Sequence, residues 1–323
     1  MATSFRLWSG LWVSVALAAL VFVGFAIYVD LTHLIAAAQT FAWGWLLPMS
    51  ALAFCNYFLR GVRLHFYLRV LGIDIRLSDS LTVSWASLVS SVTPGKAGEI
   101  VKVVFLRNLS DVPVATSASA VIAERMTDVM AMVMLASVGL TGLDVGLPVV
   151  LAVGAGVVVF WLALQVEWIV NGVLGALGSL PYVGRAAQPL KEAYGSIKVL
   201  IGMRQMAGAL SIALVAWLAE CVALDLALDA SGHALGLARS SFVYAASTLI
   251  GALSMLPGGL GPTEGSMAAM LIGSGVGEGA AAVVTLFVRL CTLWLAVIVG
   301  AVVLVANRAR LGGLRTIGEL QSD

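Results

Sequence analysis

The chain has 323 residues, of which 61% are hydrophobic and 11% are charged, and its mean hydropathy is +1.03. Soluble domains carry roughly 25% charged residues, so this composition excludes an ordinary soluble protein and predicts an all-α polytopic membrane protein. The net charge of +1, without a long basic run, argues against a nucleic-acid partner. The three cysteines lack metal-ligand spacing, and we expect neither a metal nor a cofactor.

About six apolar stretches are long enough to cross a bilayer as helices, which takes about 20 residues. They are residues 7–29, 41–59, 112–141, 147–166, 206–228 and 279–306. The first is too long for the core of a signal peptide and no small-residue cleavage site follows it, so we expect it to remain as a membrane span.

Two further apolar stretches, residues 80–107 and 240–274, are each interrupted by a Pro-Gly-x-x-Gly motif that starts at Pro94 or Pro257. With 8 Pro and 34 Gly in the chain, this motif is expected by chance roughly 0.09 times, yet it occurs twice. The interrupted arms are mostly too short to cross a hydrocarbon core of about 30 Å. We therefore predict two re-entrant helical hairpins, which a membrane tolerates where the broken backbone faces protein or water.

Basic residues follow the second and fourth predicted spans and end the chain, which places both termini in the cytoplasm by the positive-inside rule. In this interpretation Arg60 and Arg63 lie in a cytoplasmic loop after the second span. Each half then contains two spans, a hairpin and one span, and this odd number of crossings turns the second half upside down relative to the first. We predict one integral membrane domain over residues 1–323, with inverted repeats at 1–142 and 143–323.

The segment 180–204 links the two repeats. Its apolar residues recur at helical spacing from Ala186 to Ile201, which predicts an interfacial helix on the cytoplasmic surface of the membrane. A linker helix packed against the helical bundle explains the same pattern equally well.

Ionisable residues inside the predicted spans and hairpins are the first candidates for function, because each costs roughly 2.5–3.5 kcal/mol at the bilayer centre. Glu124 and Asp128 share a helix face, and Arg125 is three residues from Asp128 and can pair with it. Arg125 also follows Glu99 by 26 residues, and Arg289 follows Glu264 by 25, so ion pairs between hairpin and span are expected in both halves. Such pairs either hold the bundle together or line a path for a charged group.

A helix is expected to restart after each break, near Gly98 and near Gly265. The first turn of such a helix has unpartnered N–H groups and a partial positive charge, which suits phosphate, and Lys96 adds a full charge beside the first terminus. Alternatively, the side chains of Thr93 and Thr263 cap these N–H groups. The residues predicted to bind or translocate a substrate are Thr93, Pro94, Gly95, Lys96, Gly98, Glu99, Glu124, Arg125, Asp128, Glu220, Pro257, Gly258, Gly259, Gly261, Glu264 and Arg289.

Nothing in the sequence indicates a nucleotide-driven or catalytic centre. Ser90 stands where a P-loop ending in Gly95-Lys96 requires its first glycine. We predict no catalytic residue and expect the protein not to be an enzyme.

Four ordered motifs resemble the transmembrane region of the lysylphosphatidylglycerol synthase/flippase family. They are Thr93-Pro94-Gly95-Lys96-Ala97-Gly98-Glu99, Glu124-Arg125-Met126-Thr127-Asp128, Leu256-Pro257-Gly258-Gly259-Leu260-Gly261 followed by Glu264, and Val288-Arg289-Leu290. The resemblance covers nearly the whole chain and implies a lipid-translocating domain. Some relatives move aminoacylated phosphatidylglycerol, and others have been tied to polyprenyl-phosphate sugars or hopanoids.

The same resemblance implies that the acid and arginines of the family fall on Glu99, Arg125 and Arg289, with Glu264 displaced by two residues relative to its repeat partner. Lys96 stands where many relatives have arginine, a change from a forked donor to a point charge. Full-length synthases carry a soluble aminoacyl-transfer domain after the spans, and these 323 residues contain none, so aminoacyl transfer is not expected.

The leading hypothesis is a lipid flippase or lipid transporter of a bacterial-type cytoplasmic (inner) membrane. Its substrate would be a lipid with an anionic, phosphate-bearing headgroup: a phospholipid, an aminoacyl-phospholipid or a polyprenyl-phosphate-linked glycolipid. A membrane enzyme acting on a lipid phosphate, a small-solute transporter and a purely structural subunit are the alternatives. The expected partners are the lipid substrate and the bilayer, and the sequence is compatible with a homo-oligomer.

Overall fold

The computed structural model describes residues 31–92, 98–110, 112–140, 147–178 and 194–311, and within these ranges every regular element is a helix. The first part contains α2 (Leu31–Thr40), the 3-10 helix η1 (Trp43–Trp45), α3 (Leu46–Val70), α4 (Leu77–Ser87), the 3-10 helix η2 (Leu88–Val92), α5 (Gly98–Ser110) and α6 (Val114–Leu140). Helices α7 (Leu147–Gln165) and α8 (Glu167–Gly178) follow. The last part contains α10 (Met203–Ala230), α11 (Leu237–Leu253), the 3-10 helix η5 (Pro257–Gly259), α12 (Pro262–Gly273), α13 (Glu278–Arg289), the π-helix η6 (Leu290–Trp294) and α14 (Leu295–Ala306).

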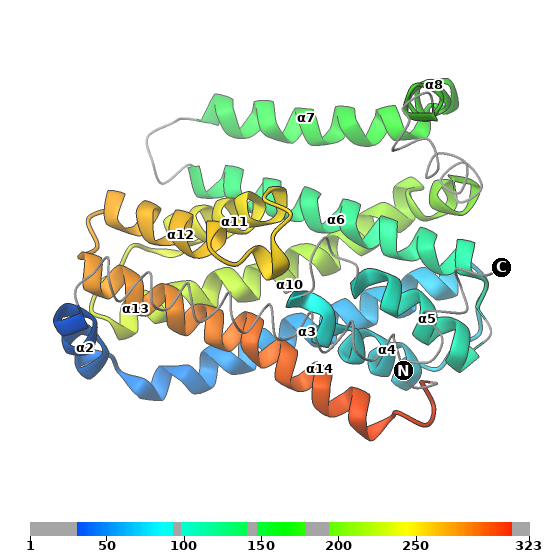
Figure 1. The fold of residues 1–323 in the computed structure, drawn as a ribbon. Helices are drawn as coiled ribbons and strands as arrows, with labels where there is room; N and C mark the ends of the chain where they lie inside the picture. The colour runs from blue at the N-terminus through cyan, green and yellow to red at the C-terminus, as the bar shows by residue number, and fades with distance from the viewer. Residues whose placement is uncertain (1–30, 93–97, 111, 141–146, 179–193, 312–323) are drawn as a thin grey trace.

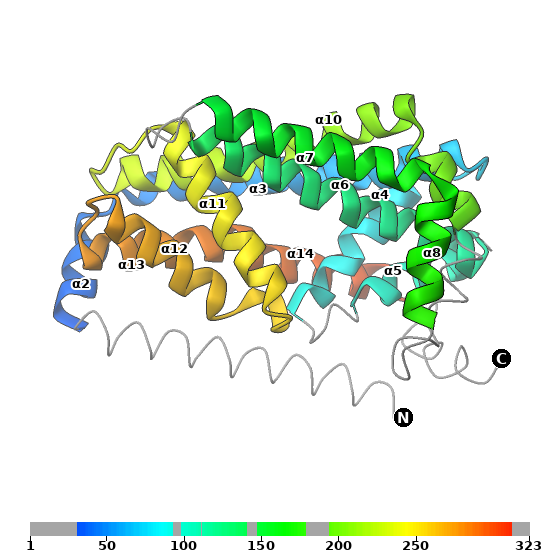
Figure 2. The same ribbon diagram turned by 90° about the horizontal axis from the view of Figure 1, so that it is seen from above.

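The first and last parts have the same order of elements: a long helix, a broken helical hairpin and a second long helix. The hairpin of α4 and α5 lies at one end of the long helices, and the hairpin of α11 and α12 lies at the opposite end (Figures 1 and 2). In the second hairpin the helices are interrupted at Pro257–Gly259, and in the first hairpin η2 ends at Val92 and α5 begins at Gly98. The second sequence motif thus marks the position where its hairpin turns, residues 93–97 of the first motif lie outside the described residues, and the membrane location of both hairpins stays a prediction.

The long helices α3 and α10 end in the same type of turn. A glycine with left-handed backbone follows each helix, at Gly72 (φ +78°) and Gly232 (φ +79°). The next amide in each case donates a hydrogen bond of 2.9 Å to a carbonyl five residues back, from Ile73 to Leu68 and from His233 to Leu228. This is the Schellman termination, in which glycine avoids the penalty that a Cβ atom would meet. The two turns lie 160 residues apart, so the repeat extends well beyond the Pro-Gly motif.

The second long helix of each part packs against the hairpin of the other part. Helix α6 lies along α11, and α14 lies along α4 and η2. Both crossings are very close: a Cβ atom added to Gly139 would lie 2.5 Å from the amide nitrogen of Phe242, and one added to Gly300 would lie 2.2 Å from that of Val89. Small residues at these crossings allow the backbones to approach, as in other helical membrane proteins.

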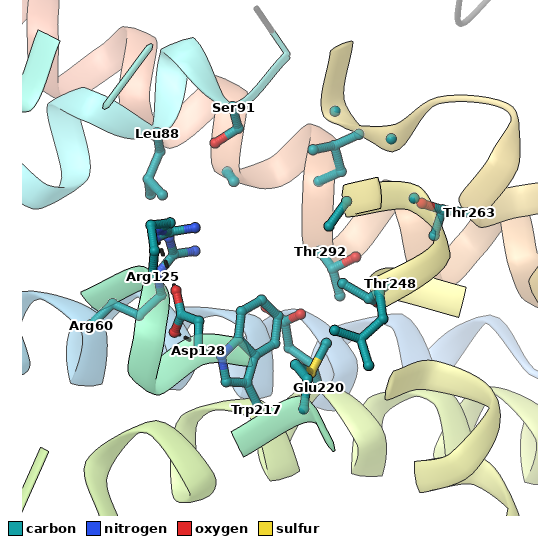
Figure 3. A pocket seen from close by; sticks show the side chains of 18 of the residues that line it. Arg60, Leu88, Ser91, Arg125, Asp128, Trp217, Glu220, Thr248, Thr263 and Thr292 are labelled. Atoms are coloured by element: carbon teal, nitrogen blue, oxygen red, sulfur yellow. Dashed lines mark hydrogen bonds and ion pairs between the residues drawn. The ribbon is translucent and has the colours of Figure 1, made fainter. Parts of the chain in front are cut away.

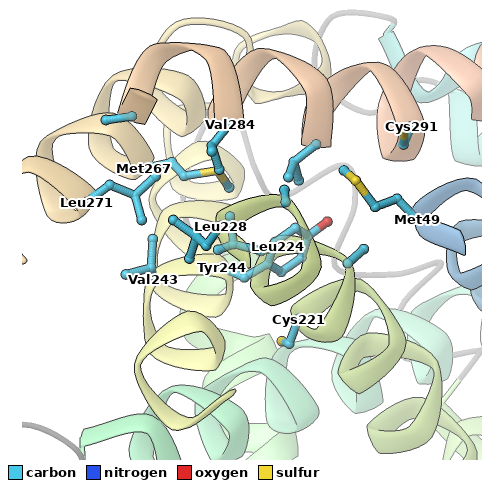
Figure 4. Close-up of a cluster of buried hydrophobic side chains, with 14 of the residues drawn as sticks. Met49, Cys221, Leu224, Leu228, Val243, Tyr244, Met267, Leu271, Val284 and Cys291 are labelled. Carbon is cyan, nitrogen blue, oxygen red and sulfur yellow. The ribbon is translucent and has the colours of Figure 1, made fainter. Parts of the chain in front are cut away.

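The largest apolar core lies where α10 packs between α3 and the second hairpin (Figure 4). Leu224 and Leu228 on α10 are fully buried there against Met267 of α12 and Val284 of α13. The other end of the bundle has its own core around α3, α4, α5 and α6. Because each hairpin is packed at its own end, the region between the two cores is left for the polar site described below.

Two helices of the described part are both long and apolar enough to cross a membrane, Met203–Ala230 and the continuous Glu278–Ala306. They coincide with the predicted spans 206–228 and 279–306. Predicted spans 112–141 and 147–166 coincide with α6 and α7, whose passage through a membrane stays a prediction. The predicted span 7–29 lies outside the described residues.

The prediction that Arg63 lies in a loop after the second span is wrong. Helix α3 continues to Val70, and Arg63, which the sequence interpretation placed in a cytoplasmic loop, is 0% exposed. The predicted span ends where the apolar run ends, and the positive-inside rule assigns the arginines that follow to the cytoplasm. In the structure Arg63 is instead compensated by a carboxylate of α6, Asp128.

The linker between the two parts is described from residue 194 onward, and residues 194–200 are helical. Its apolar side chains Ile197, Leu200 and Ile201 are buried against the bundle. The indole N–H of Trp161 on α7 donates to the carbonyl of Ile201 at 2.9 Å and fixes the end of this helix. This part of the linker packs on protein, and the remainder of the predicted segment 180–204 lies outside the described residues.

Candidate functional site

A cavity of about 340 Å³ lies between the two hairpins, and both parts of the chain contribute to its wall. Among the described lining residues, four are cationic and two are acidic, which leaves an excess of two positive charges. These residues are Arg60, Lys102, Arg125, Arg289, Asp128 and Glu220. Figure 3 shows Arg60, Arg125 and Asp128 on one side of the cavity and the hydroxyl side chains Thr248, Thr263 and Thr292 on the other.

The two hairpins meet at this cavity. Val92, the last residue of η2 before the first break, lies against Gly258 in the second break: a Cβ atom added to Gly258 would be 3.3 Å from a methyl group of Val92. Val92 also shares a small apolar cluster with Leu260, Leu293 and Val297. The end of η2 and the second break are therefore adjacent in space, whereas residues 93–97 of the first motif lie outside the described residues.

Arg289 at the end of α13 holds the second break in place. Its Nε lies 2.5 Å from Oε1 of Glu264, and its NH2 group donates to the carbonyl of Gly258 at 2.7 Å. The other carboxylate oxygen of Glu264 accepts a hydrogen bond of 2.7 Å from the amide of Gly261. Both residues are buried, and Arg289 also reaches the cavity wall.

The helix after the second break begins at Pro262 and not near Gly265, where it was predicted to restart. Proline is favoured in the first turn of a helix because it lacks the N–H group that would be unpaired there. Glu264 in the first turn reaches back to the amide of Gly261, which is one arm of a capping box. The N-terminus of α12 therefore already binds a carboxylate of the protein, that of Glu264. After the first break, the helix begins where it was predicted to restart, since α5 begins at Gly98.

Asp128 on α6 forms ion pairs with two arginines and accepts one hydrogen bond from an indole, with partners on three helices. The guanidinium of Arg63 on α3 lies 2.7 Å from Oδ1, and the indole N–H of Trp217 on α10 donates to the same oxygen at 2.9 Å. Arg125, one turn earlier on α6, lies 2.9 Å from Oδ2, so the predicted pairing of Arg125 with Asp128 is confirmed. A carboxylate with this many donors is fixed in one orientation.

A second buried pair joins α5 to α6. Nζ of Lys102 lies 2.7 Å from Oε2 of Glu124, and both side chains are almost fully buried. Lys102 also lines the cavity, whereas Glu124 lies behind it. The pair ties the second arm of the first hairpin to α6, as Arg289 and Glu264 tie the second hairpin to α13.

Aromatic side chains complete the wall. The guanidinium of Arg60 lies over the ring of Trp217, 5.8 Å from its centroid, and the hydroxyl of Tyr244 donates to the carboxylate of Glu220. The hydroxyl of Tyr57 donates to the carbonyl of Thr292 at 2.6 Å within the π-helix η6. A π-turn interrupts the regular hydrogen-bond ladder of a helix and is frequent at functional sites.

The structure brings part of the predicted set together. Arg125, Asp128, Glu220, Gly258, Gly259 and Arg289 line the cavity. Glu124, Pro257, Gly261 and Glu264 lie behind the lining residues, where they pair with them or shape the second break. Thr93, Pro94, Gly95 and Lys96 lie outside the described residues, and of Gly98 and Glu99 only the backbone is described.

Sequence reasoning missed Arg60, Arg63, Lys102 and Trp217. A signal for the first two was present: Asn56, Arg60, Arg63 and Tyr67 follow one another at spacings of four, three and four, which is one stripe of a helix. Such a polar stripe on an apolar helix indicates a face turned to other polar groups. Lys102 likewise lies three residues after Glu99, on the same face of α5.

Comparison with known proteins agrees with the motifs. A family model described as the lysylphosphatidylglycerol synthase TM region matches residues 11–300. A UPF0104 membrane protein of Methanothermobacter thermautotrophicus is 26% identical over 254 residues, which cover 70% of this chain and 75% of the relative. A UPF0104 membrane protein of Pyrococcus horikoshii is 25% identical over 250 residues, which cover 69% and 75%.

The family match includes both Pro-Gly motifs and every described residue of the cavity wall, and it ends at residue 300, within α14. The chain therefore belongs to the family of the lysylphosphatidylglycerol synthase transmembrane region.

Proposed function

We propose that the protein is a lipid flippase that moves a lipid with a phosphate-bearing headgroup between the two leaflets of a bacterial-type cytoplasmic membrane. The headgroup would cross through the cavity between the hairpins while the acyl chains stay in the bilayer. A phospholipid, an aminoacyl-phospholipid and a polyprenyl-phosphate-linked glycolipid all carry the required group.

The observation that carries this proposal is a positively charged cavity built jointly by two hairpins that enter from opposite ends of the bundle. Ionisable residues in a membrane protein are costly and usually mark a substrate path. Here four cations and two carboxylates line one cavity. With Arg63, Glu124 and Glu264 directly behind the wall, the set has five cations and four carboxylates, an excess of one positive charge that favours an anionic group. A bundle held together by ion pairs alone would not need to leave this space open.

The rim of the cavity favours a lipid over a small polar solute. Met255 and Leu256 line the cavity and are also exposed, so the cavity reaches the surface between apolar side chains. Leu253, two residues earlier, is 81% exposed. Met255 has a left-handed backbone (φ +56°), which is unusual for a residue with a long side chain. An apolar rim at a polar cavity suits an amphipathic molecule whose tails remain outside.

This function requires a particular placement in the membrane. In the proposed arrangement the two hairpins are re-entrant and approach the midplane from opposite sides, as in transporters with inverted repeats. The first hairpin opens to the cytoplasm, the second opens to the outside, and both termini are cytoplasmic. Small, close-packed crossings at Gly139 and Gly300 would keep the two repeats intertwined around the cavity.

Reconstitution into phosphatidylcholine vesicles tests the proposal directly. Vesicles carrying fluorescent phosphatidylglycerol are treated with dithionite, which bleaches the outer leaflet only. We expect the protein to raise the bleached fraction above the half that protein-free vesicles show, and Arg125→Ala and Arg289→Ala, made one at a time, to slow this change. Glu99→Ala belongs to the same series, because Glu99 holds the position in the first motif that corresponds to an acid of the family.

A matched control keeps the residue assignment falsifiable. Arg204→Ala changes an exposed arginine on α10 away from the cavity and should leave translocation unchanged. Equal rates for the wild type and all three site variants would reject the assignment of these residues. Chemical conversion of the lipid by protein in detergent, where no second leaflet exists, would instead favour the membrane enzyme.

A further inference from the structure

We infer that Arg60, placed over Trp217, is the group in the cavity that binds the phosphate of the substrate. This inference rests on the proposed function and assigns its recognition step to a residue outside both Pro-Gly motifs. The ligand class is a phosphate mono- or diester, and lipid headgroups and free inorganic phosphate share this chemistry.

Three of the four described cations of the cavity wall have carboxylate partners. Lys102 lies 2.7 Å from Glu124, and Arg289 lies 2.5 Å from Glu264. Arg125 lies 2.9 Å from Asp128. Each pair is formed between buried or half-buried groups, so a ligand phosphate would have to compete with an acid that is already in place.

Arg60 differs from these three. Within the described ranges, no carboxylate oxygen lies within ion-pair distance of its guanidinium, although Asp128 and Glu220 line the same cavity. Its described contact is with the ring of Trp217, at 5.8 Å from the centroid. A contact with an aromatic face stabilises the cation without using its N–H donors. The forked donors of a guanidinium suit two oxygens of one phosphate.

A chain of buried contacts positions this pair. Arg63 is fully buried and binds Asp128, and Asp128 accepts the indole N–H of Trp217. The indole in turn lies under Arg60. Arg63 does not line the cavity, so it acts through the carboxylate and the indole and is a positioning residue. Figure 3 shows Arg60, Asp128 and Trp217 gathered at one side of the cavity.

Binding to the full chain in detergent tests this inference. The probes are dioctanoyl phosphatidylglycerol, dioctanoylglycerol, which lacks the phosphate, and inorganic phosphate, each followed by titration calorimetry. We expect wild-type protein to bind the phospholipid and not the diacylglycerol, and Arg60→Gln to weaken phospholipid binding by roughly tenfold to hundredfold, the loss typical of a hydrogen bond to a charged group. Arg60→Lys keeps the charge and loses the forked donors, so its affinity for the phospholipid should lie between those of the wild type and Arg60→Gln.

Two further variants separate recognition from folding. Trp217→Phe keeps an aromatic face but loses the N–H bond to Asp128, so it should weaken phospholipid binding less than Trp217→Leu. Arg204→Gln, an exposed arginine on the same helix as Trp217, should bind as the wild type does. Competition by inorganic phosphate at micromolar concentration would identify free phosphate as the ligand, and its absence would identify the lipid headgroup.

The inference and the proposed function fail in different ways. Phospholipid binding that is the same for Arg60→Gln and wild type, or equal binding of diacylglycerol and phospholipid, overturns the role of Arg60 even if vesicles show translocation. Absence of translocation by wild-type protein, together with Arg60-dependent binding of a phosphate probe, rejects the flippase and leaves the binding site standing. Wild-type protein that binds neither phosphate probe also overturns the inference.

Discussion

Arg125 and Arg289 follow the breaks of their hairpins at nearly equal distances along the chain, but they are held in different surroundings. Arg289 binds Glu264 and the carbonyl of Gly258, which both belong to the second hairpin. Arg125 binds Asp128 on its own helix, and that carboxylate also receives Arg63 from α3 and Trp217 from α10. The network of Arg289 and Glu264 is local to the second break, whereas the network around Asp128 joins the three long helices α3, α6 and α10.

This difference assigns the two networks different tasks. The network around Glu264 fixes the shape of one hairpin, so its loss should affect the cavity wall on that side. The network around Asp128 fixes the crossing of α3, α6 and α10 and also positions the indole under Arg60. The arginines that follow the two copies of the motif therefore have different roles: Arg289 shapes the cavity wall, and Arg125 belongs to the network that supports the whole bundle.

Asp128→Asn should have the largest effect, because it leaves the wholly buried Arg63 without a carboxylate. Removing one partner of a buried ion pair typically costs about 3 to 5 kcal/mol. The measurement is the free energy of unfolding of purified protein in mixed micelles titrated with denaturing detergent. The double variant Arg63→Met with Asp128→Leu should recover most of this loss, since apolar residues can replace a buried pair. A double variant as unstable as Asp128→Asn would show that the carboxylate has a role beyond compensating Arg63.

Glu264→Gln should cost less, about 1.5 to 3 kcal/mol, the value typical of a hydrogen bond to a charged group. Glutamine keeps the shape and an acceptor for the amide of Gly261, and Arg289 keeps the carbonyl of Gly258. The same unfolding titration measures the change. If Glu264→Gln destabilised the protein more than Asp128→Asn, the network around Glu264 would have to extend beyond the second hairpin. The contrast with the network around Asp128 would then be lost.

The two glycine crossings provide a more nearly symmetric comparison. Gly139→Ala and Gly300→Ala each place a methyl group within 2.6 Å of backbone atoms of the opposing hairpin arm, so both should destabilise the protein, by about 1 to 3 kcal/mol. Gly154→Ala on α7 is the control, because a Cβ atom there meets nothing within 4 Å and alanine favours a helix. Unequal losses at Gly139 and Gly300 would show that the two crossings are not equivalent.

Much of the fold was predictable because it depends on local chemistry. Proline and glycine interrupt helices, so the sequence located both breaks and the start of α5, and spacing along one helix predicted the pairing of Arg125 with Asp128. The pairing of Glu264 with Arg289 was also among the expected ion pairs and is confirmed.

The missed residues depend on contacts between distant helices. Arg63 is buried because Asp128, 65 residues later, lies beside it, and no local pattern states which helices cross. The predicted span follows the length of the apolar run, and the positive-inside rule assigns the arginines after it to a cytoplasmic loop, so Arg60 falls outside the predicted site. The start of α12 lies three residues before the predicted position, because Pro262 is accommodated in the first turn and Glu264 caps the amide of Gly261.

The exposed pair of Glu167 and Lys198 should have the smallest effect and serves as the surface counterpart of the buried pairs. Its hydrogen bond lowers the pKa of Glu167 and raises the pKa of Lys198. A lowered acid pKa stabilises the fold above the ordinary value of 4.5 and loses this effect as the pH falls through the lowered value. A raised lysine pKa stabilises it below the ordinary value of 10.5 and loses the effect as the pH rises through the raised value.

The contribution of this pair is therefore present between these two pH values, and it is small because water and salt screen both charges. We expect Glu167→Gln to leave the melting temperature at pH 7 within the error of the measurement, whereas Asp128→Asn lowers it clearly under the same conditions. A large loss for Glu167→Gln would mean that the contact between α8 and the linker helix matters for the whole bundle. In that case the stability of the two parts would depend on the segment between them as well as on their shared cavity.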